Sequence, residues 1–274
     1  MKFRHKFSIG VQVAVSMGTV AALVAACGGG GGGSGVAGAT TAAHYAYVVN
    51  YSSNNVTQYK IGANGSLTLM AASLVAAGTH PNSIAVDPSG RFAYATNFSS
   101  NNVTQYTIGA DGSLTPMAAS QVAAGIAPQS IAVAPSGKYV YVVSYSDSSV
   151  SQYIIGGNGA LTPMAPASAA TGTYPSSITT DPSGKYAYVA NMSANNVSQY
   201  TIGGSGALAA IASGVVTAGT APYAIAIDPS GKYAYAVNVT GSVTQYTIGA
   251  DGGLTPMTAS MVATGLMPLS IAIH

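Results

Sequence analysis

The sequence predicts an all-β fold, a single β-propeller of five four-stranded blades, and two repeated segments carry that prediction. Pro-Ser-Gly followed by a basic and an aromatic residue begins four times at a spacing of 47 residues, at Pro88, Pro135, Pro182 and Pro229. Val-(Thr/Ser)-Gln-Tyr begins five times, with a last spacing of 46, at Val56, Val103, Val150, Val197 and Val243. A period of about 40–50 residues with strand-like content is typical of propeller blades, because one such unit cannot bury both faces alone.

The second copy shows how one repeat makes four short strands. Residues 83–87 form an apolar run that ends in Asp-Pro-Ser-Gly, where proline and glycine favour a tight turn. Residues 92–96 alternate large and small side chains, as strands do, and 103–108 form the third strand. The fourth strand lies within 113–122, after an Asp-Gly turn. Four strands with turn signals between them form one blade.

The two ends of the repeat region predict how the ring closes. The region begins at residue 44 with the second strand of the unit and ends at 270–274 with a first strand. We therefore expect the C-terminal strand to join the N-terminal blade and close the ring, which would remove exposed sheet edges. An open arc of five blades is the alternative.

The first 43 residues predict export and lipid anchoring. Three basic residues within the first six precede an apolar stretch that ends at Cys27, the only cysteine. This pattern resembles a bacterial lipoprotein signal, which implies a signal peptide over 1–26 and a lipidated Cys27 at the head of a glycine-rich tether over 27–43. The propeller would then occupy 44–274. An uncleaved transmembrane anchor is the alternative.

Removal of the signal peptide changes the charge of the chain. It takes away three of the eight Lys and Arg residues and leaves all six aspartates, so the mature part has a net charge of −1. No basic patch remains, which argues against a nucleic-acid partner. The partner we expect is the membrane, through the lipid on Cys27. Gly28, in place of an aspartate, favours the outer membrane of the cell envelope, with the propeller facing the periplasm or the surface.

Three strings identify a family resemblance that covers residues 44–274. PNSIAVDPSGRFAYATN (81–97), PSSITTDPSGKYAYVAN (175–191) and GADGSLTPM (109–117) resemble the lactonase-type β-propellers and the overlapping Tyr-Val-Thr-Asn repeat group. Some members of that family are 6-phosphogluconolactonases, and others are envelope proteins without a known reaction. The family's enzymes usually have seven blades, whereas this chain has five copies of the repeat.

Few residues are candidates for acid–base chemistry. The folded part has no glutamate, and five of its six aspartates lie in turns of the repeat, where a local structural role is expected. His80 and Asp147 stand apart from the repeat pattern and form the one candidate catalytic pair. The remaining histidines and acids show no metal-ligand spacing, so we expect neither a metal nor another cofactor.

The differences between repeats predict a ligand-binding rim. The loop before each inner strand keeps the frame Gly-x-x-Pro while the residues around the proline vary, and the loop after each second strand varies as well. In a propeller these loops converge around one mouth of the central channel, where ligands commonly bind. The predicted rim consists of Tyr51, His80, Asn82, Phe98, Gln129, Tyr145, Tyr174 and Tyr223. It would suit a glycan or a peptide; the alternative is that these loops simply drifted.

These observations favour a non-catalytic function. We expect an envelope lipoprotein that binds or scaffolds, and a lactone hydrolase is the alternative. The glutamine present in every copy, from Gln58 to Gln245, is expected to make a structural hydrogen bond within the sheets.

Overall fold

The computed structural model describes residues 44–273 as five antiparallel sheets. Blade 1 has three strands, β1 (His44–Asn50), β2 (Asn55–Ile61) and β3 (Leu67–Ala76). The predicted signal peptide, Cys27 and the tether lie outside the described residues.

Blades 2 to 5 have four strands each, paired in chain order. They are β4 (Pro81–Val86), β5 (Phe92–Asn97), β6 (Asn102–Ile108) and β7 (Leu114–Ala123); β8 (Pro128–Val133), β9 (Tyr139–Ser144), β10 (Ser149–Ile155) and β11 (Leu161–Ala170); β12 (Pro175–Thr180), β13 (Tyr186–Asn191), β14 (Asn196–Ile202) and β15 (Leu208–Thr217); and β16 (Pro222–Ile227), β17 (Tyr233–Asn238), β18 (Ser242–Ile248) and β19 (Leu254–Ala263). The predicted all-β fold with five repeated sheets is confirmed.

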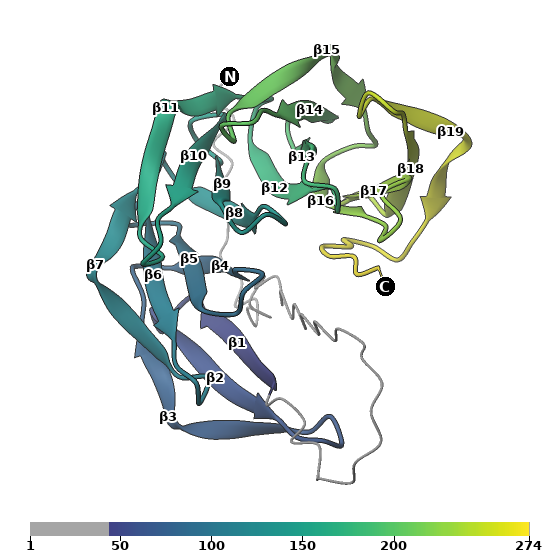
Figure 1. The fold of residues 1–274 in the computed structure, drawn as a ribbon. Helices are drawn as coiled ribbons and strands as arrows, with labels where there is room; N and C mark the ends of the chain where they lie inside the picture. The colour runs from purple at the N-terminus through teal and green to yellow at the C-terminus, as the bar shows by residue number, and fades with distance from the viewer. Residues whose placement is uncertain (1–43, 274) are drawn as a thin grey trace, which may run out of the picture.

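The sheets are arranged side by side along an arc (Figure 1). The first strands of blades 2 to 5 line its inner side, and the long fourth strands form its outer side. The sequence explains the corners between first and second strands. The Asp87 carboxylate accepts hydrogen bonds from the backbone N–H groups of Arg91 and Phe92, at 2.8 and 2.7 Å, while Gly90 takes a φ of 69°. The structural role expected for this aspartate is therefore observed.

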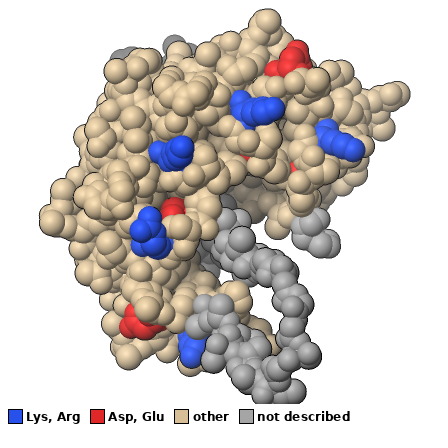
Figure 2. All heavy atoms as spheres, viewed as in Figure 1, with Lys and Arg blue, Asp and Glu red and all other residues tan. Residues whose placement is uncertain are grey.

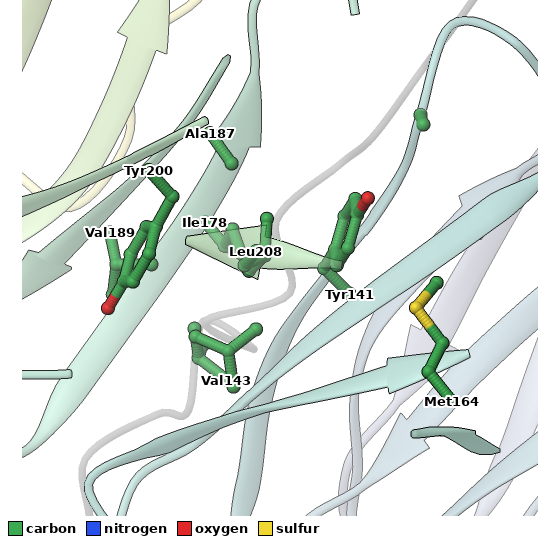
Figure 3. Close-up of a cluster of buried hydrophobic side chains, with 10 residues drawn as sticks. Tyr141, Val143, Met164, Ile178, Ala187, Val189, Tyr200 and Leu208 are labelled. Carbon is green, nitrogen blue, oxygen red and sulfur yellow. The ribbon is translucent and has the colours of Figure 1, made fainter. Parts of the chain in front are cut away.

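Neighbouring blades pack through apolar layers that repeat from one interface to the next. Between blades 3 and 4, Tyr141 and Val143 face Ile178, Tyr200 and Leu208 (Figure 3). Second-strand residues of one blade thus meet residues from three strands of the next blade. The alternation of tyrosine with small residues in the second strand leaves room for this packing.

The same three hydrogen bonds between blades recur at every internal interface. At the first interface, the Gln58 side-chain oxygen accepts from the Leu114 N–H at 2.6 Å, and the Tyr47 hydroxyl donates to the Gly112 carbonyl at 2.6 Å. In return, the Tyr106 hydroxyl of blade 2 donates to the Ala76 carbonyl at 2.8 Å. The amide of Gln58 also donates to its own blade at Ala72. The repeated glutamine therefore has the structural role expected, and it also joins one blade to the next.

The predicted ring closure is not present in this structure. Residues 264–273 form no strand, and β1 pairs only with β2. Figure 1 shows the C-terminal end lying beside blade 5, with an opening between it and blade 1. The ring stays open because no strand forms after β19, so none is available to pair with the inner edge of β1 within residues 44–273. The alternative, an open arc, describes this structure.

Candidate functional site

The loops that enter the inner strands share one unusual backbone conformation. The residue before each proline has a φ between 53° and 57°, at His80, Ala127, Tyr174, Ala221 and Met267. In three of the five copies an asparagine of the preceding blade bonds this residue: the Asn54 side chain accepts a hydrogen bond from the His80 N–H at 2.8 Å, and Asn101 and Asn195 bond Ala127 and Ala221 in the same way. The glycine of Gly-x-x-Pro is needed for close packing, because a Cβ on Gly78 would lie 2.6 Å from the Asn97 side chain. The side chain at the variable position is thereby held at the channel mouth.

Tyr51, His80 and Phe98 form one aromatic wall of this mouth. The rings of Tyr51 and His80 are stacked, with centroids 4.4 Å apart and an interplanar angle of 10°. Phe98 lies 6.5 Å from Tyr51 in a tilted arrangement. Three rim residues predicted from different loops are therefore brought together, although their loops are far apart in the sequence.

The imidazole of His80 also contacts a hydroxyl group. Its Nδ1 atom lies 2.6 Å from the Oγ atom of Ser99. The stack on Tyr51 and this hydrogen bond fix both the plane and the rotation of the ring. When Nδ1 carries its proton toward Ser99, Nε2 is the basic nitrogen, as a general base requires.

A second wall joins blades 3 and 4 at the same mouth. Tyr145 and Tyr174 are stacked, with centroids 4.6 Å apart and an interplanar angle of 14°. Burial raises the pKa of Tyr145, and the neighbouring Tyr174 raises it further. The two stacked rings offer flat apolar faces with hydroxyl edges, a surface suited to a sugar ring.

Two more rim residues meet from blades that are not adjacent. The Gln129 amide of blade 3 donates to the Tyr223 hydroxyl of blade 5 at 3.2 Å. A cavity of about 30 Å³ lies beside them, and it is lined by Gln129, Ser130, Ser176, Ser177, Tyr223, Ala224 and Leu269. Burial raises the pKa of Tyr223. This part of the channel is polar and narrow.

The candidate catalytic pair is not in contact. Asp147 accepts a hydrogen bond from the Ile126 N–H at 2.5 Å, and no contact with His80 is present in residues 44–273. Ser100, at the same repeat position in blade 2, bonds the Thr79 N–H in the same way. The structure thus gives Asp147 a loop-holding role. Asn82, predicted on the rim, is only 8 % exposed, so its side chain is buried.

The sequence did not single out Ser99. A hydroxyl occurs at the same position in every copy, as Ser52, Ser146, Ser193 and Thr240 show, so repetition made it look structural. Only His80 among the residues before the prolines can bond this hydroxyl through an imidazole. The signal was therefore the combination of a repeated serine with a unique histidine.

Basic side chains lie at the other mouth of the channel. Arg91, Lys138, Lys185 and Lys232 share a repeat position beside the Asp-Pro-Ser-Gly corners, at the opposite end of the inner strands from His80. Figure 2 shows basic side chains spaced along an arc on one face. A groove of about 480 Å³ opens between the inner strands near the corners and is largely apolar, with lining residues that include Val86, Ile131 and Ile178.

The described residues contain neither a metal-binding cluster nor a membrane-spanning helix. No group of three or more His, Cys, Asp or Glu side chains is placed to hold a metal ion there. The same residues contain no helix of the length and apolar character needed to cross a membrane.

Comparison with known proteins identifies the family. Residues 13–269 match the family model described as lactonase, 7-bladed β-propeller. The chain belongs to this family. No curated protein matches it. The lactonase resemblance expected from the sequence is thereby confirmed.

Solved structures show that this lactonase-family chain shares its fold with longer proteins. A candidate 6-phosphogluconolactonase from Bacteroides fragilis superposes with a TM-score of 0.75 at 22 % identity, over 87 % of this chain and 73 % of that one. The periplasmic gluconolactonase PpgL of Pseudomonas aeruginosa gives 0.70 at 18 % identity, over 81 % and 68 %. At these identities the likeness concerns the fold.

The family match corrects the function expected from the sequence. A non-catalytic binding or scaffolding module was the wrong choice, because the chain matches an enzyme family over most of its length. The expectation relied on the scarcity of free acidic groups. An imidazole held by a hydroxyl group offers a basic nitrogen without any carboxylate. The scarcity of free acidic groups was therefore a poor guide to whether the chain is an enzyme.

Proposed function

We propose that the chain is a lactone hydrolase that works at the channel mouth bearing His80. The observation that carries this proposal is the fixed imidazole, stacked on Tyr51 at 4.4 Å and bonded to Ser99 at 2.6 Å. Membership of the lactonase family supports this reaction class. The aromatic walls would hold a sugar-derived lactone ring by stacking.

The chemistry follows from the basic nitrogen. Nε2 of His80 takes a proton from a water molecule as the water oxygen attacks the lactone carbonyl carbon. The tetrahedral intermediate then collapses with cleavage of the ring C–O bond, and the proton passes from His80 to the departing alkoxide. One ester bond and one water molecule are consumed, and one hydroxy acid is formed. Ser99 and Tyr51 orient the imidazole throughout.

Replacement of His80 tests this assignment. His80→Ala in the full chain is expected to lower kcat/KM for glucono-1,5-lactone or 6-phosphogluconolactone by about 10²–10⁴. The variant should fold normally, because Ala127 and Ala221 adopt the same backbone conformation in blades 3 and 5. Turnover is followed by acid release at constant pH, together with a thermal melt.

His44→Ala is the matched control, since His44 begins β1 at the other end of the sheets. It should leave turnover unchanged. Equal turnover in His80→Ala and the parent chain, or no turnover of either lactone by the parent chain, would overturn the proposal.

We also propose that the chain acts in the cell envelope, anchored through Cys27. The basic and apolar start that ends at Cys27 supports this, as does the similarity to a periplasmic gluconolactonase. Cys27→Ser is expected to move the protein from the membrane fraction to the soluble fraction, or to leave its signal peptide uncut. An unchanged distribution and an unchanged mass would contradict the anchor.

A further inference from the structure

The charged side chains of the propeller are gathered at the end opposite His80. Residues 44–273 contain five Lys and Arg residues and six aspartates. Arg91, Lys138, Lys185 and Lys232 lie directly before second strands, and Lys60 is the second-last residue of β2. Five aspartates lie at the same end, in the corners after the first strands and in the Asp-Gly turns between third and fourth strands. Figure 2 shows basic and acidic side chains together on one face.

The mouth that bears His80 has one charged side chain among the described Lys, Arg and Asp residues, that of Asp147. Its carboxylate accepts a hydrogen bond from the Ile126 N–H at 2.5 Å, and its charge repels an anion. His80 adds no positive charge when it acts as a base, because a general base must be neutral. The three remaining basic residues of the chain lie within the first six residues, in the predicted signal peptide. This mouth therefore offers no cation to a bound ligand.

The cations at the other end are too far away to serve a ligand beside His80. The two ends are separated by an inner strand such as β12, which has six residues and spans roughly 20 Å. A group attached to a single sugar ring does not cover that length. Arg91 is also held at its own corner, where its Nε donates to the Ser89 hydroxyl at 3.2 Å and its guanidinium lies 4.9 Å from the centre of the Phe92 ring.

The groups that the His80 mouth does offer are uncharged. The aromatic walls present flat ring faces, and the Gln129 amide lies deeper in the channel. Exposed hydroxyl groups follow the second strands, on Ser52, Ser146, Ser193 and Thr240. Such groups pair well with the hydroxyls of a sugar. A phosphate dianion placed among them would lose its water without gaining a charge-assisted hydrogen bond from Lys or Arg.

We infer that the substrate is an uncharged sugar lactone, such as glucono-1,5-lactone, rather than a lactone that carries a phosphate group. This inference rests on the proposed hydrolase function and adds the charge of the substrate to it. The fold shared with the candidate 6-phosphogluconolactonase, at 22 % identity, does not decide the point, because a fold does not determine the side chains of its loops.

Two slowly reacting analogues separate binding from turnover. In D-glucono-1,5-lactam a nitrogen replaces the ring oxygen, so water opens the ring far more slowly than that of the lactone. Quenching of the tyrosine fluorescence of the full chain measures the affinity for this lactam and for its 6-phosphate. We expect the neutral lactam to bind at least about tenfold more tightly. The kcat/KM for glucono-1,5-lactone should exceed that for 6-phosphogluconolactone by a similar factor, measured as acid release.

Ala221→Lys tests whether the missing cation is the reason. It places an ammonium group at the repeat position of His80 in blade 5, where the backbone conformation also accepts the large side chains of Tyr174 and Met267. The affinity for the phosphorylated lactam should rise about tenfold, while that for the neutral lactam stays the same. Lys185→Gln is the matched control, because it removes a cation from the opposite end. It should change neither affinity.

The outcomes distinguish this inference from the hydrolase proposal. A phosphorylated lactam that binds as tightly as the neutral one, or that loses affinity in Lys185→Gln, would overturn the inference and leave lactone hydrolysis standing. An unchanged ratio of affinities in Ala221→Lys, or no binding of either lactam, would also overturn it. Tighter binding of the neutral lactam without turnover of either lactone would instead sink the hydrolase proposal and leave the preference for an uncharged ring standing.

Discussion

The internal blade interfaces and the two ends of the arc have nearly the same sequence in very different surroundings. Leu208 is 8 % exposed between blades 3 and 4, and Leu67 is 57 % exposed on blade 1. Gln152 bonds the Leu208 N–H at 2.6 Å, whereas the oxygen of Gln245 has no such partner in the described residues. The comparison teaches that a repeat residue stabilises the fold only where a neighbouring blade completes its contacts.

The largest expected difference in stability is between a leucine at an internal interface and its equivalent on blade 1. Leu208→Ala should lower the free energy of unfolding by about 2–5 kcal/mol, because it opens a cavity between two blades. Leu67→Ala should change it by less than about 0.5 kcal/mol in the monomer, because the side chain is already in solvent. Urea unfolding at low protein concentration measures both. Equal losses in the two variants would mean that blade 1 is covered in solution.

A smaller difference is expected for the third-strand tyrosines. The Tyr153 hydroxyl donates to the Ala123 carbonyl of the preceding blade at 2.6 Å, so Tyr153→Phe should cost about 1 kcal/mol at neutral pH. Tyr59→Phe, at the equivalent position of blade 1, should cost almost nothing. Thermal melts of the two variants give the comparison, and matching losses would contradict it.

The same tyrosine predicts the direction of a pH effect. Burial raises the pKa of Tyr153 to about 12 from an ordinary value of 10.0. Between these values the unfolded chain loses the phenolic proton while the folded chain keeps it. The contribution of Tyr153 to stability is therefore fully present below pH 10 and falls as the pH rises toward 12. Tyr153→Phe should make this fall shallower.

The comparison also explains why the sequence pointed to His80 as a candidate residue but did not show which side chains hold its imidazole. Its uniqueness among repeats is visible in the sequence, since Ala127, Tyr174 and Ala221 occupy the same position. Its contacts with Tyr51 and Ser99 join loops that are 29 and 19 residues away, and only the packing of neighbouring blades brings them together. Asp147 looked equally exceptional, yet its carboxylate holds a backbone N–H, as Ser100 does in blade 2.

The sequence by itself determined the strands, the corners and the number of blades. These features depend on local chemistry: alternating side chains, the proline and glycine of the turns, and an aspartate that bonds the backbone a few residues away. The 47-residue spacing also fixed which residues share a face, and the lactonase resemblance was visible in the same strings.

Only the tertiary structure decided whether the ring closes and which rim residues meet. Closure depends on how the blades pack against one another. Small differences in side-chain packing accumulate over the four interfaces, and no local sequence pattern encodes their sum. The fixed imidazole at the channel mouth and the two unpaired ends of the arc have the same origin. Both depend on where residues from different blades meet or fail to meet, which is settled by the packing of whole blades.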